Sequence, residues 1–314
     1  MDWKKKFIIG AGLLATTTAT LHVINKYIQI NVSQNKSLDY IPDLYYSWKY
    51  GEISYTKQGK GTPILLIHDL TTYSSGYEWH KVAKKLSETN TVYSIDLLGC
   101  GNSDKPNILY TNFLYVQLIT DFIKNVIGDK TSIAATGESA AFVLASCNNN
   151  TDIIDKIIMI NPMDINILTK APNKISSLFT KIINLPVFGT FIYNILSGRN
   201  KINSLFNTDY YSNYTFEEDE IAKVYYETAH AKGSKHLFAS LAGFYTTIHI
   251  FHCMNLLKNN ISIIVGDDLD EYKDIAEEYQ DIYPLTTIHK IEETKYLPQL
   301  EKPEKIVDII RAIV

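Results

Sequence analysis

Arginine is almost absent from this sequence. The chain has 314 residues and 30 basic side chains, yet only Arg199 and Arg311 are arginine and the others are lysine. Arginine provides the planar, two-pronged hydrogen bonding that clamps carboxylates and phosphates, so clamps of that kind are not expected. The formal net charge of −4 leaves no basic excess for a nucleic-acid surface. We therefore expect no nucleic-acid partner.

Cysteine is scarce as well. Cys100, Cys147 and Cys253 form neither a C-x-x-C pair nor an even set. This spacing excludes the common zinc, redox and disulfide patterns. The glycines of GCGNSD (99–104) do not form the G-x-G-x-x-G turn of a dinucleotide site. We expect neither a metal nor a cofactor.

One long apolar run is present, near the N-terminus. Lys4 to Lys6 precede residues 7–24, which as a helix would be about 27 Å long, close to the thickness of a bilayer core. Four threonines and His22 weaken the run. The pattern favours an uncleaved membrane anchor over residues 1–28, a polar tether over 29–44 and an extracytoplasmic domain. A cleaved signal peptide and an amphipathic surface helix are the alternatives.

The rest of the chain has the composition of a globular protein, with 46% hydrophobic and 20% charged residues. Apolar runs of strand length alternate with amphipathic helices over residues 45–162 and 246–314. This alternation predicts an α/β core with a doubly wound, mostly parallel sheet. Residues 163–245 show helical patterns and no strand, which predicts a helical cap inserted into the core.

One predicted strand end has the pattern of a nucleophile. Ligands of open α/β sheets bind beyond the carboxyl ends of the strands. The segment ATGESAA (135–141) places Ser139 between Gly137 and Ala141, at a turn from strand to helix. Small residues on both sides of a serine are typical of the strained elbow that exposes a nucleophile. A simple helix N-cap is the alternative.

Two more strand ends complete a resemblance. They read IHDLTTYSSGYEW (67–79) and DLLGCGNSDKP (96–106). Together with Gly137-Glu138-Ser139 they resemble the α/β-hydrolase family, in which a His-Gly loop, Ser-Ser, Trp and D-L-x-G-x-G-x-S-D-K-P precede the serine elbow. The resemblance extends over about residues 45–314 and implies the α/β-hydrolase fold with its cap.

The resemblance also implies roles for matching residues. Ser139 would be the nucleophile, and the amides of Leu70 and Ala140 would bind the oxyanion next to the loop formed by His68 and Asp69.

The triad acid and base are less regular. The family places the acid three residues after the glycine that ends a strand, but that position is Leu269, flanked by Asp268 and Asp270. Asp164, after the preceding strand, is an alternative acid. The residue aligned with the family histidine is Tyr296.

Four departures from the family pattern accumulate: Asp69 and Ala141 stand where glycine is usual, Leu269 stands at the acid position, and Tyr296 replaces histidine. The pKa of tyrosine is about 10, against about 6.5 for histidine, so a phenol is a poor general base at neutral pH. Loss of the base in a serine triad can lower turnover by roughly 10⁶. A carboxylate at position 69 would also oppose a developing oxyanion.

Other residues could serve as the base. His249 and His252 precede a predicted strand, whereas His289 lies far from Tyr296 along the final strand. A tyrosinate at Tyr296, with its pKa lowered by Lys295, is a further hypothesis.

Two functions follow from the sequence. The first is a serine hydrolase of esterase or lipase-like type, acting on a small or medium apolar acyl substrate. The second is an inactive pseudo-hydrolase that binds a small-molecule ligand or a protein. Ser139 favours the first, and Tyr296 with Asp69 favours the second.

Overall fold

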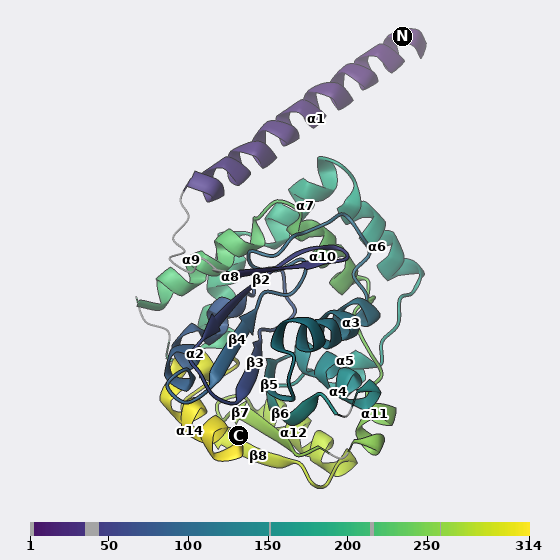
Figure 1. Cartoon of the computed structure of the whole chain (residues 1–314). Coiled ribbons are helices and arrows are strands. Elements are labelled where there is room, and N and C mark those ends of the chain that lie inside the picture. Colours follow the sequence, from purple (N-terminus) through teal and green to yellow (C-terminus); the bar gives the residue numbers. More distant parts are fainter. Residues whose placement is uncertain (1–2, 35–43, 151, 214–216, 258) are drawn as a thin grey trace.

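The computed structural model describes residues 3–34, 44–150, 152–213, 217–257 and 259–314. Its first element is a long helix, α1 (Trp3–Gln34), which projects from the molecule and contacts it at the helix α7 (Phe188–Leu196) (Figure 1).

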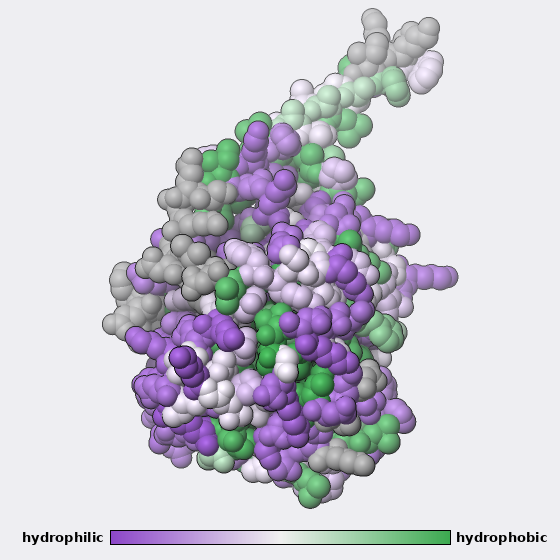
Figure 2. Space-filling model, viewed as in Figure 1, coloured by the Kyte–Doolittle hydropathy of each residue, from purple (hydrophilic) through white to green (hydrophobic). Residues whose placement is uncertain are grey.

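Helix α1 contains the residues predicted as a membrane anchor. Apolar and more polar residues mix along it (Figure 2), and the hydroxyls of Thr16, Thr18 and Thr20 donate to carbonyls one turn earlier at 2.8–3.0 Å. Among the described residues, no single helix is both long and apolar enough to cross a bilayer. The anchor predicted over 1–28 is therefore not supported. Residues 35–43 of the predicted tether lie outside the described residues.

Eight strands form one sheet in the order β1-β2-β4-β3-β5-β6-β7-β8. β1 and β2 form an antiparallel hairpin, β2 also pairs antiparallel with β4, and all other pairs are parallel. The predicted doubly wound, mostly parallel sheet is confirmed. The strands are β1 (Leu44–Trp48), β2 (Gly51–Gln58), β3 (Pro63–Ile67), β4 (Thr91–Ile95), β5 (Thr131–Thr136), β6 (Ile154–Ile160), β7 (Ile261–Gly266) and β8 (Thr287–Ile291).

Helices cover both faces of the sheet (Figure 1). Successive side chains of a strand point to opposite faces, so Ile64 and Leu66 of β3 belong to one apolar cluster and Leu65 and Ile67 to the other. The first cluster includes residues of α2 (His80–Leu86) and α14 (Pro303–Ile313). The second includes residues of α3 (Asn112–Phe122), α4 (Ser139–Asn149), α11 (Phe251–Leu256) and α12 (Asp270–Ile282). Burial on both faces explains why these strands read as continuous apolar runs.

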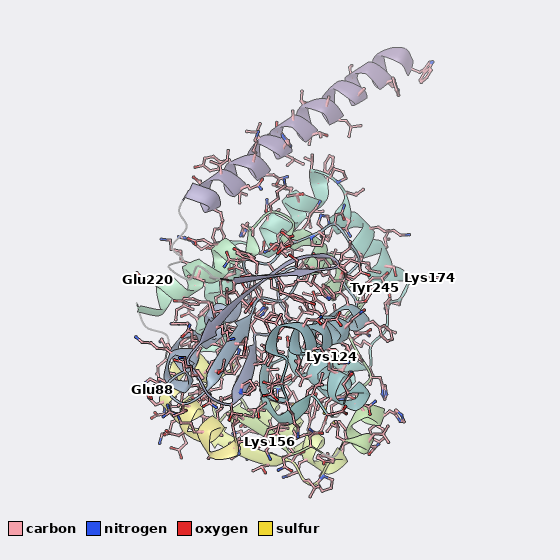
Figure 3. The ribbon with its side chains drawn as sticks, in the orientation of Figure 1. Glu88, Lys124, Lys156, Lys174, Glu220 and Tyr245 are labelled. Atoms are coloured by element: carbon pink, nitrogen blue, oxygen red, sulfur yellow. The ribbon has the colours of Figure 1, made fainter. Side chains whose placement is uncertain are left out.

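The described residues between β6 and α11 form helices joined by turns and irregular segments, and no strand occurs among them. This segment contains α5 (Ile165–Leu168), α6 (Lys174–Asn184), α7, α8 (Arg199–Leu205), a π-helical turn Phe206–Tyr210, α9 (Glu217–Ala229) and α10 (Ser234–Ala242). Ser177 of α6 hydrogen-bonds through its hydroxyl to that of Tyr245 at 3.1 Å (Figure 3, where Tyr245 and Lys174 are labelled). The range predicted as the cap, 163–245, lies within this segment, and the division of the chain into domains stays a prediction.

Candidate functional site

Three segments that are distant in the sequence meet where β3 and β5 end. Their centre is the carboxylate of Asp69, which follows β3 and is almost fully buried. Its Oδ2 accepts a hydrogen bond from the Tyr296 hydroxyl at 2.8 Å. Its Oδ1 accepts from the backbone amides of Leu70 at 2.8 Å and Glu138 at 3.0 Å. We call Asp69, Gly137, Tyr296 and the amides of Leu70 and Glu138 the strand-end centre.

Tyr296 is held in place from two sides. The side-chain amide of Asn161, just after β6, donates to the Tyr296 carbonyl at 2.8 Å. The Tyr296 amide donates to the Asp209 carbonyl of the cap at 3.3 Å. Because hydrogen bonds to the core and to the cap both hold the Tyr296 backbone, its phenol is directed toward Asp69.

Gly137 is the residue at the sharp turn between β5 and α4. Its φ of +57° lies in the left-handed region, which glycine adopts without strain. A Cβ added to Gly137 would collide with the Asp69 carboxylate and the Tyr296 hydroxyl. The space into which a side chain at this turn would project is therefore already occupied.

Three carboxyl groups are buried together near this point. Burial raises the pKa of Asp69, while the hydrogen bonds from Tyr296 and the two amides lower it. Burial, followed by the nearby Asp69, raises the pKa of Glu78 to about 8. Burial also raises the pKa of Glu138 to about 8. Glu78 accepts hydrogen bonds from the Asp69 amide at 3.2 Å and the Tyr225 hydroxyl at 2.9 Å.

Aromatic rings fill the space between the strand-end centre and the cap. The Tyr210 ring stacks on Tyr296 at 5.3 Å between centroids, and the Tyr272 ring lies 5.2 Å from Tyr296. Phe206 makes edge contacts with Tyr210 at 5.3 Å and with Tyr225 at 5.0 Å. A hydrolase of this fold needs room for its substrate under the cap, whereas this volume is packed with side chains.

The segment DLLGCGNSDKP forms a closed structural loop. Asp96 accepts hydrogen bonds from the amides of Gly76 and Asn102, both at 2.7 Å. Ser103 donates to the Asp96 carbonyl at 2.6 Å and accepts from the Ser54 amide at 2.8 Å. The motif with the most specific match in the sequence therefore joins β2, β4 and the segment after β3, and supplies no reacting group.

Known proteins resemble this chain in sequence over about a third of its length. No family model matches the chain. A 111-residue segment is 31% identical to 2-hydroxy-6-oxo-6-(2'-aminophenyl)hexa-2,4-dienoic acid hydrolase of Metapseudomonas resinovorans, covering 34% of this chain and 38% of that protein. A 109-residue segment is 28% identical to soluble epoxide hydrolase of a Corynebacterium species, covering 34% and 37%. These matches span little more than a third of either relative.

The structural match is more extensive. The enol-lactonase of Burkholderia xenovorans superposes with a TM-score of 0.69 at 13% identity, covering 86% of this chain and 98% of that one. The fold is that of the α/β-hydrolases. In this fold the nucleophile occupies the strained residue between the central strand and the following helix. In this chain that residue is Gly137.

Ser139, predicted as the nucleophile, lies two residues further on, at the first position of α4. It is fully buried, and its hydroxyl donates to the His68 carbonyl at 2.6 Å. The geometry does not give Ser139 the exposed hydroxyl that the prediction requires. The sequence already allowed this alternative. Ala135 and Ser139 are small residues on either side of Gly137, at the same spacing as the small residues on either side of Ser139. The segment ATGESAA therefore fits the elbow pattern with either Gly137 or Ser139 at the nucleophile position.

The oxyanion donors of an α/β-hydrolase are one amide after β3 and the amide that follows the nucleophile. At this place the structure has the amides of Leu70 and Glu138, which both donate to Asp69 Oδ1. The predicted amide of Ala140 is directed elsewhere, since it donates to the Gly137 carbonyl at 3.3 Å. Oδ1 of Asp69 thus occupies the place where an oxyanion would bind.

The aspartates proposed as the triad acid lie outside the strand-end centre. Asp268 accepts a hydrogen bond from the Ser212 hydroxyl of the cap. Asp270 is 94% exposed at its side chain and pairs with Lys273 at 2.8 Å, which lowers the pKa of Asp270. Asp164 caps α5 by accepting from the Asn166 amide at 2.6 Å. Leu269 packs among the aromatic residues beside Tyr296.

The candidate bases are equally remote or unsuitable. Burial and the adjacent Asp69 raise the pKa of Tyr296 well above its ordinary value, so its phenol stays protonated. Lys295 does not lower it, because the Lys295 ammonium donates to the Thr208 carbonyl at 2.8 Å. His249 and His252 are exposed at the start of α11, and His289 lies on β8.

His68, predicted within the oxyanion loop, has a structural role. Its Nδ1 donates to the Asp69 carbonyl at 2.6 Å, and its Nε2 accepts from the Leu97 amide at 3.0 Å. Burial lowers the pKa of His68, so the ring is neutral. It ties the end of β3 to the end of β4. Among the described residues, no group of three or more His, Cys, Asp or Glu side chains could hold a metal ion.

Proposed function

We propose that this chain is a pseudo-hydrolase, an α/β-hydrolase-fold protein without hydrolytic activity that acts by binding a ligand or partner. One observation carries the proposal: the residue at the strained elbow is Gly137, and the space beside it is filled by Asp69 and Tyr296. Glycine offers no nucleophilic side chain, and the Asp69 carboxylate already accepts both oxyanion-type amides. An acyl substrate would find neither a nucleophile nor a free oxyanion site.

The experiment compares the full-length wild-type chain with Ser139→Ala and with Ser146→Ala as a matched control. Ser146 lies on the same helix and is also buried, and its hydroxyl donates to the Val116 carbonyl at 3.2 Å. Short- and long-chain nitrophenyl esters measure hydrolysis, and a fluorophosphonate probe followed by mass spectrometry detects any activated serine.

We expect the three proteins to hydrolyse the esters at the same background rate, with no label on Ser139. Hydrolysis or labelling that disappears in Ser139→Ala and persists in Ser146→Ala would overturn the proposal. A third variant, Asp69→Gly/Gly137→Ser/Tyr296→His, places a serine and a histidine at the family positions. Labelling at residue 137 in this variant is expected, because the backbone donors and the elbow are retained.

A slow esterase is the second candidate. It is favoured by the relatives, which are named as hydrolases. Its substrate would be a small or medium apolar acyl compound. The same ester and probe experiment decides between the two candidates.

Attachment to a membrane through residues 7–24, with the domain outside the cytoplasm, is a separate part of the proposal. The attachment, though not the side of the membrane, is supported by the exposed side chains of Phe7, Leu13 and Leu14 on α1. Deletion of residues 3–24 is expected to move the protein from the membrane fraction to the supernatant. An unchanged distribution would contradict it.

A further inference from the structure

A cavity of about 750 Å³ lies between α1 and the cap, and none of the strand-end centre residues lines it. Its walls come from α1, the turn between β1 and β2, the loop after β4, α7 and the turn between α9 and α10. A volume of this size is in the usual range for small-molecule sites, roughly 300–1,000 Å³. We call this cavity the basic pocket.

The charges around the basic pocket are mostly of one sign. Lys26, Lys105, Lys232 and Lys235 line it, and Asp104 is the single acidic residue in the lining. The Asp104 carboxylate accepts a hydrogen bond from the Glu52 amide at 2.9 Å, so part of its acceptor capacity is used. In the described part of the chain, Lys26, Lys232 and Lys235 form no ion pair with an acidic side chain.

A helix N-terminus adds to this positive potential. Helix α10 has nine residues and is preceded by Gly233, whose φ is +100°. A Cβ on Gly233 would collide with the Lys105 carbonyl. The close approach permitted by glycine brings the start of α10, with Lys232 and Lys235, against the loop that carries Lys105. The positive end of a helix dipole favours an anion at this place.

Helix α1 closes the basic pocket through specific contacts. The side-chain amide of Asn25 donates to the Val187 carbonyl at 2.9 Å, and the Asn194 amide donates to Oδ1 of Asn25 at 3.0 Å. These bonds orient the helix face that carries Lys26 toward the cap. The N-terminal helix is thus one wall of the pocket.

We propose that the basic pocket binds the phosphate group of a small organic molecule. Lysine binds phosphate as a point charge, and three of the four lysines here have no acidic partner among the described residues. The cavity is much larger than a bare phosphate, and Thr190, Val187 and Pro106 provide polar and apolar surface for the organic part. This inference does not rest on the absence of catalysis at the strand-end centre.

A phosphate group of this kind has two possible sources, a soluble phosphate ester or the headgroup of an anionic phospholipid. Isothermal titration of the full-length chain with glycerol 3-phosphate tests the first. Flotation with phosphatidylglycerol vesicles, compared with phosphatidylcholine vesicles, tests the second. Helix α1 is present in every variant, so only differences between variants report on the pocket.

The decisive variant is Lys232→Gln/Lys235→Gln, with Lys181→Gln as the matched control. Lys181 is an exposed lysine of α6 that does not line the pocket. Each lost lysine is expected to weaken binding about tenfold, because hydrogen bonds to charged groups contribute about 1.5 kcal/mol or more. Circular dichroism confirms that the variants fold.

Binding of glycerol 3-phosphate that is lost in the double variant and kept in Lys181→Gln would support a soluble ligand. The same pattern with phosphatidylglycerol vesicles alone would support a lipid headgroup. The proposal is overturned if neither probe binds the wild-type chain, or if the control loses as much affinity as the double variant.

Discussion

In the strand-end centre the Asp69 carboxylate accepts hydrogen bonds from three protein donors, whereas in the basic pocket the charged side chains line an open cavity. The first region carries the residues by which an α/β-hydrolase is usually identified, yet aromatic rings pack it. The second carries none of them and has room for a ligand. The comparison teaches that in this chain the space at the strand ends is filled, whereas room for a ligand lies elsewhere, between α1 and the cap.

The two regions also differ in the sign of their ionisable groups and in how deeply these groups are buried. At the strand-end centre three carboxyl groups are buried, and burial raises the pKa of each. Burial favours the neutral forms of Glu78 and Glu138, because little water remains to solvate a charge, whereas the three hydrogen bonds donated to Asp69 oppose this effect. Of the lysines of the basic pocket, Lys26 and Lys232 are exposed, whereas the ammonium groups of Lys105 and Lys235 donate to backbone carbonyls at 2.6 and 3.1 Å.

The largest expected effect comes from adding a side chain to the elbow. Gly137→Ser should lower the free energy of unfolding by about 3 kcal/mol, because a non-glycine residue is strained at positive φ and its Cβ meets Asp69 and Tyr296. Gly128→Ser is the matched control, since Gly128 has φ of +71° and nothing within 4 Å of an added Cβ. Strain alone should cost this control about 1 kcal/mol. Urea denaturation measures both, and equal losses would show that the space beside Gly137 is open.

The next effect concerns the pH dependence of stability. Glu78 and Glu138 have folded-state pKa values of about 8, above the ordinary value of 4.5. The contribution of these two groups to the free energy of unfolding is therefore greatest below pH 4.5, their pKa in the unfolded chain, and is lost as the pH rises toward 8. Glu138→Gln should remove part of this slope and raise stability at pH 8 by about 2 kcal/mol. The exposed Glu220, labelled in Figure 3, provides the control variant Glu220→Gln, for which urea denaturation from pH 5 to 9 should give the wild-type slope. A wild-type slope in Glu138→Gln as well would show that Glu138 is not buried as described.

A smaller loss of stability is expected when Ser139 is replaced, because its hydroxyl forms a structural hydrogen bond. Its hydroxyl donates to His68 across the end of the sheet, so Ser139→Ala should cost about 1 kcal/mol of stability. Thermal unfolding measures this loss. A stability equal to that of the wild type would mean that the Ser139 hydroxyl is not engaged and is available for other roles.

The smallest effect is expected at the wall of the basic pocket. Asn25→Leu removes two hydrogen bonds between α1 and the cap and should weaken glycerol 3-phosphate binding about threefold, with a stability change below about 1 kcal/mol. Thr18→Ala, on an exposed part of α1 that does not line the pocket, is the control. Titration calorimetry checks both variants. Unchanged affinity in Asn25→Leu would show that the contacts of α1 with the cap do not contribute to binding in the pocket.

The sequence by itself determined the fold and most of the strands and motifs by which it is identified. Strand runs such as PILLI, at 63–67, are apolar throughout because both faces of the sheet are covered, so their length and composition identify them. The DLLGCGNSDKP loop could be recognised because it matches a long motif of the α/β-hydrolase family, although its hydrogen bonds also reach distant residues such as Ser54 and Gly76. The replacement of the family histidine by Tyr296 was visible in the same way. The membrane span predicted from length was not supported, and the threonines that lower the apolarity of the helix were already visible in the sequence.

Only the tertiary structure decided what occupies the site. The register of ATGESAA depended on a backbone angle at Gly137, which the spacing of small residues leaves open. The hydrogen bond between Asp69 and Tyr296 joins residues 227 positions apart, and the lysines of the basic pocket come from α1, a core loop and the cap. Local sequence patterns reflect short-range sterics and burial, whereas the filling of a cavity depends on which distant segments the sheet brings together.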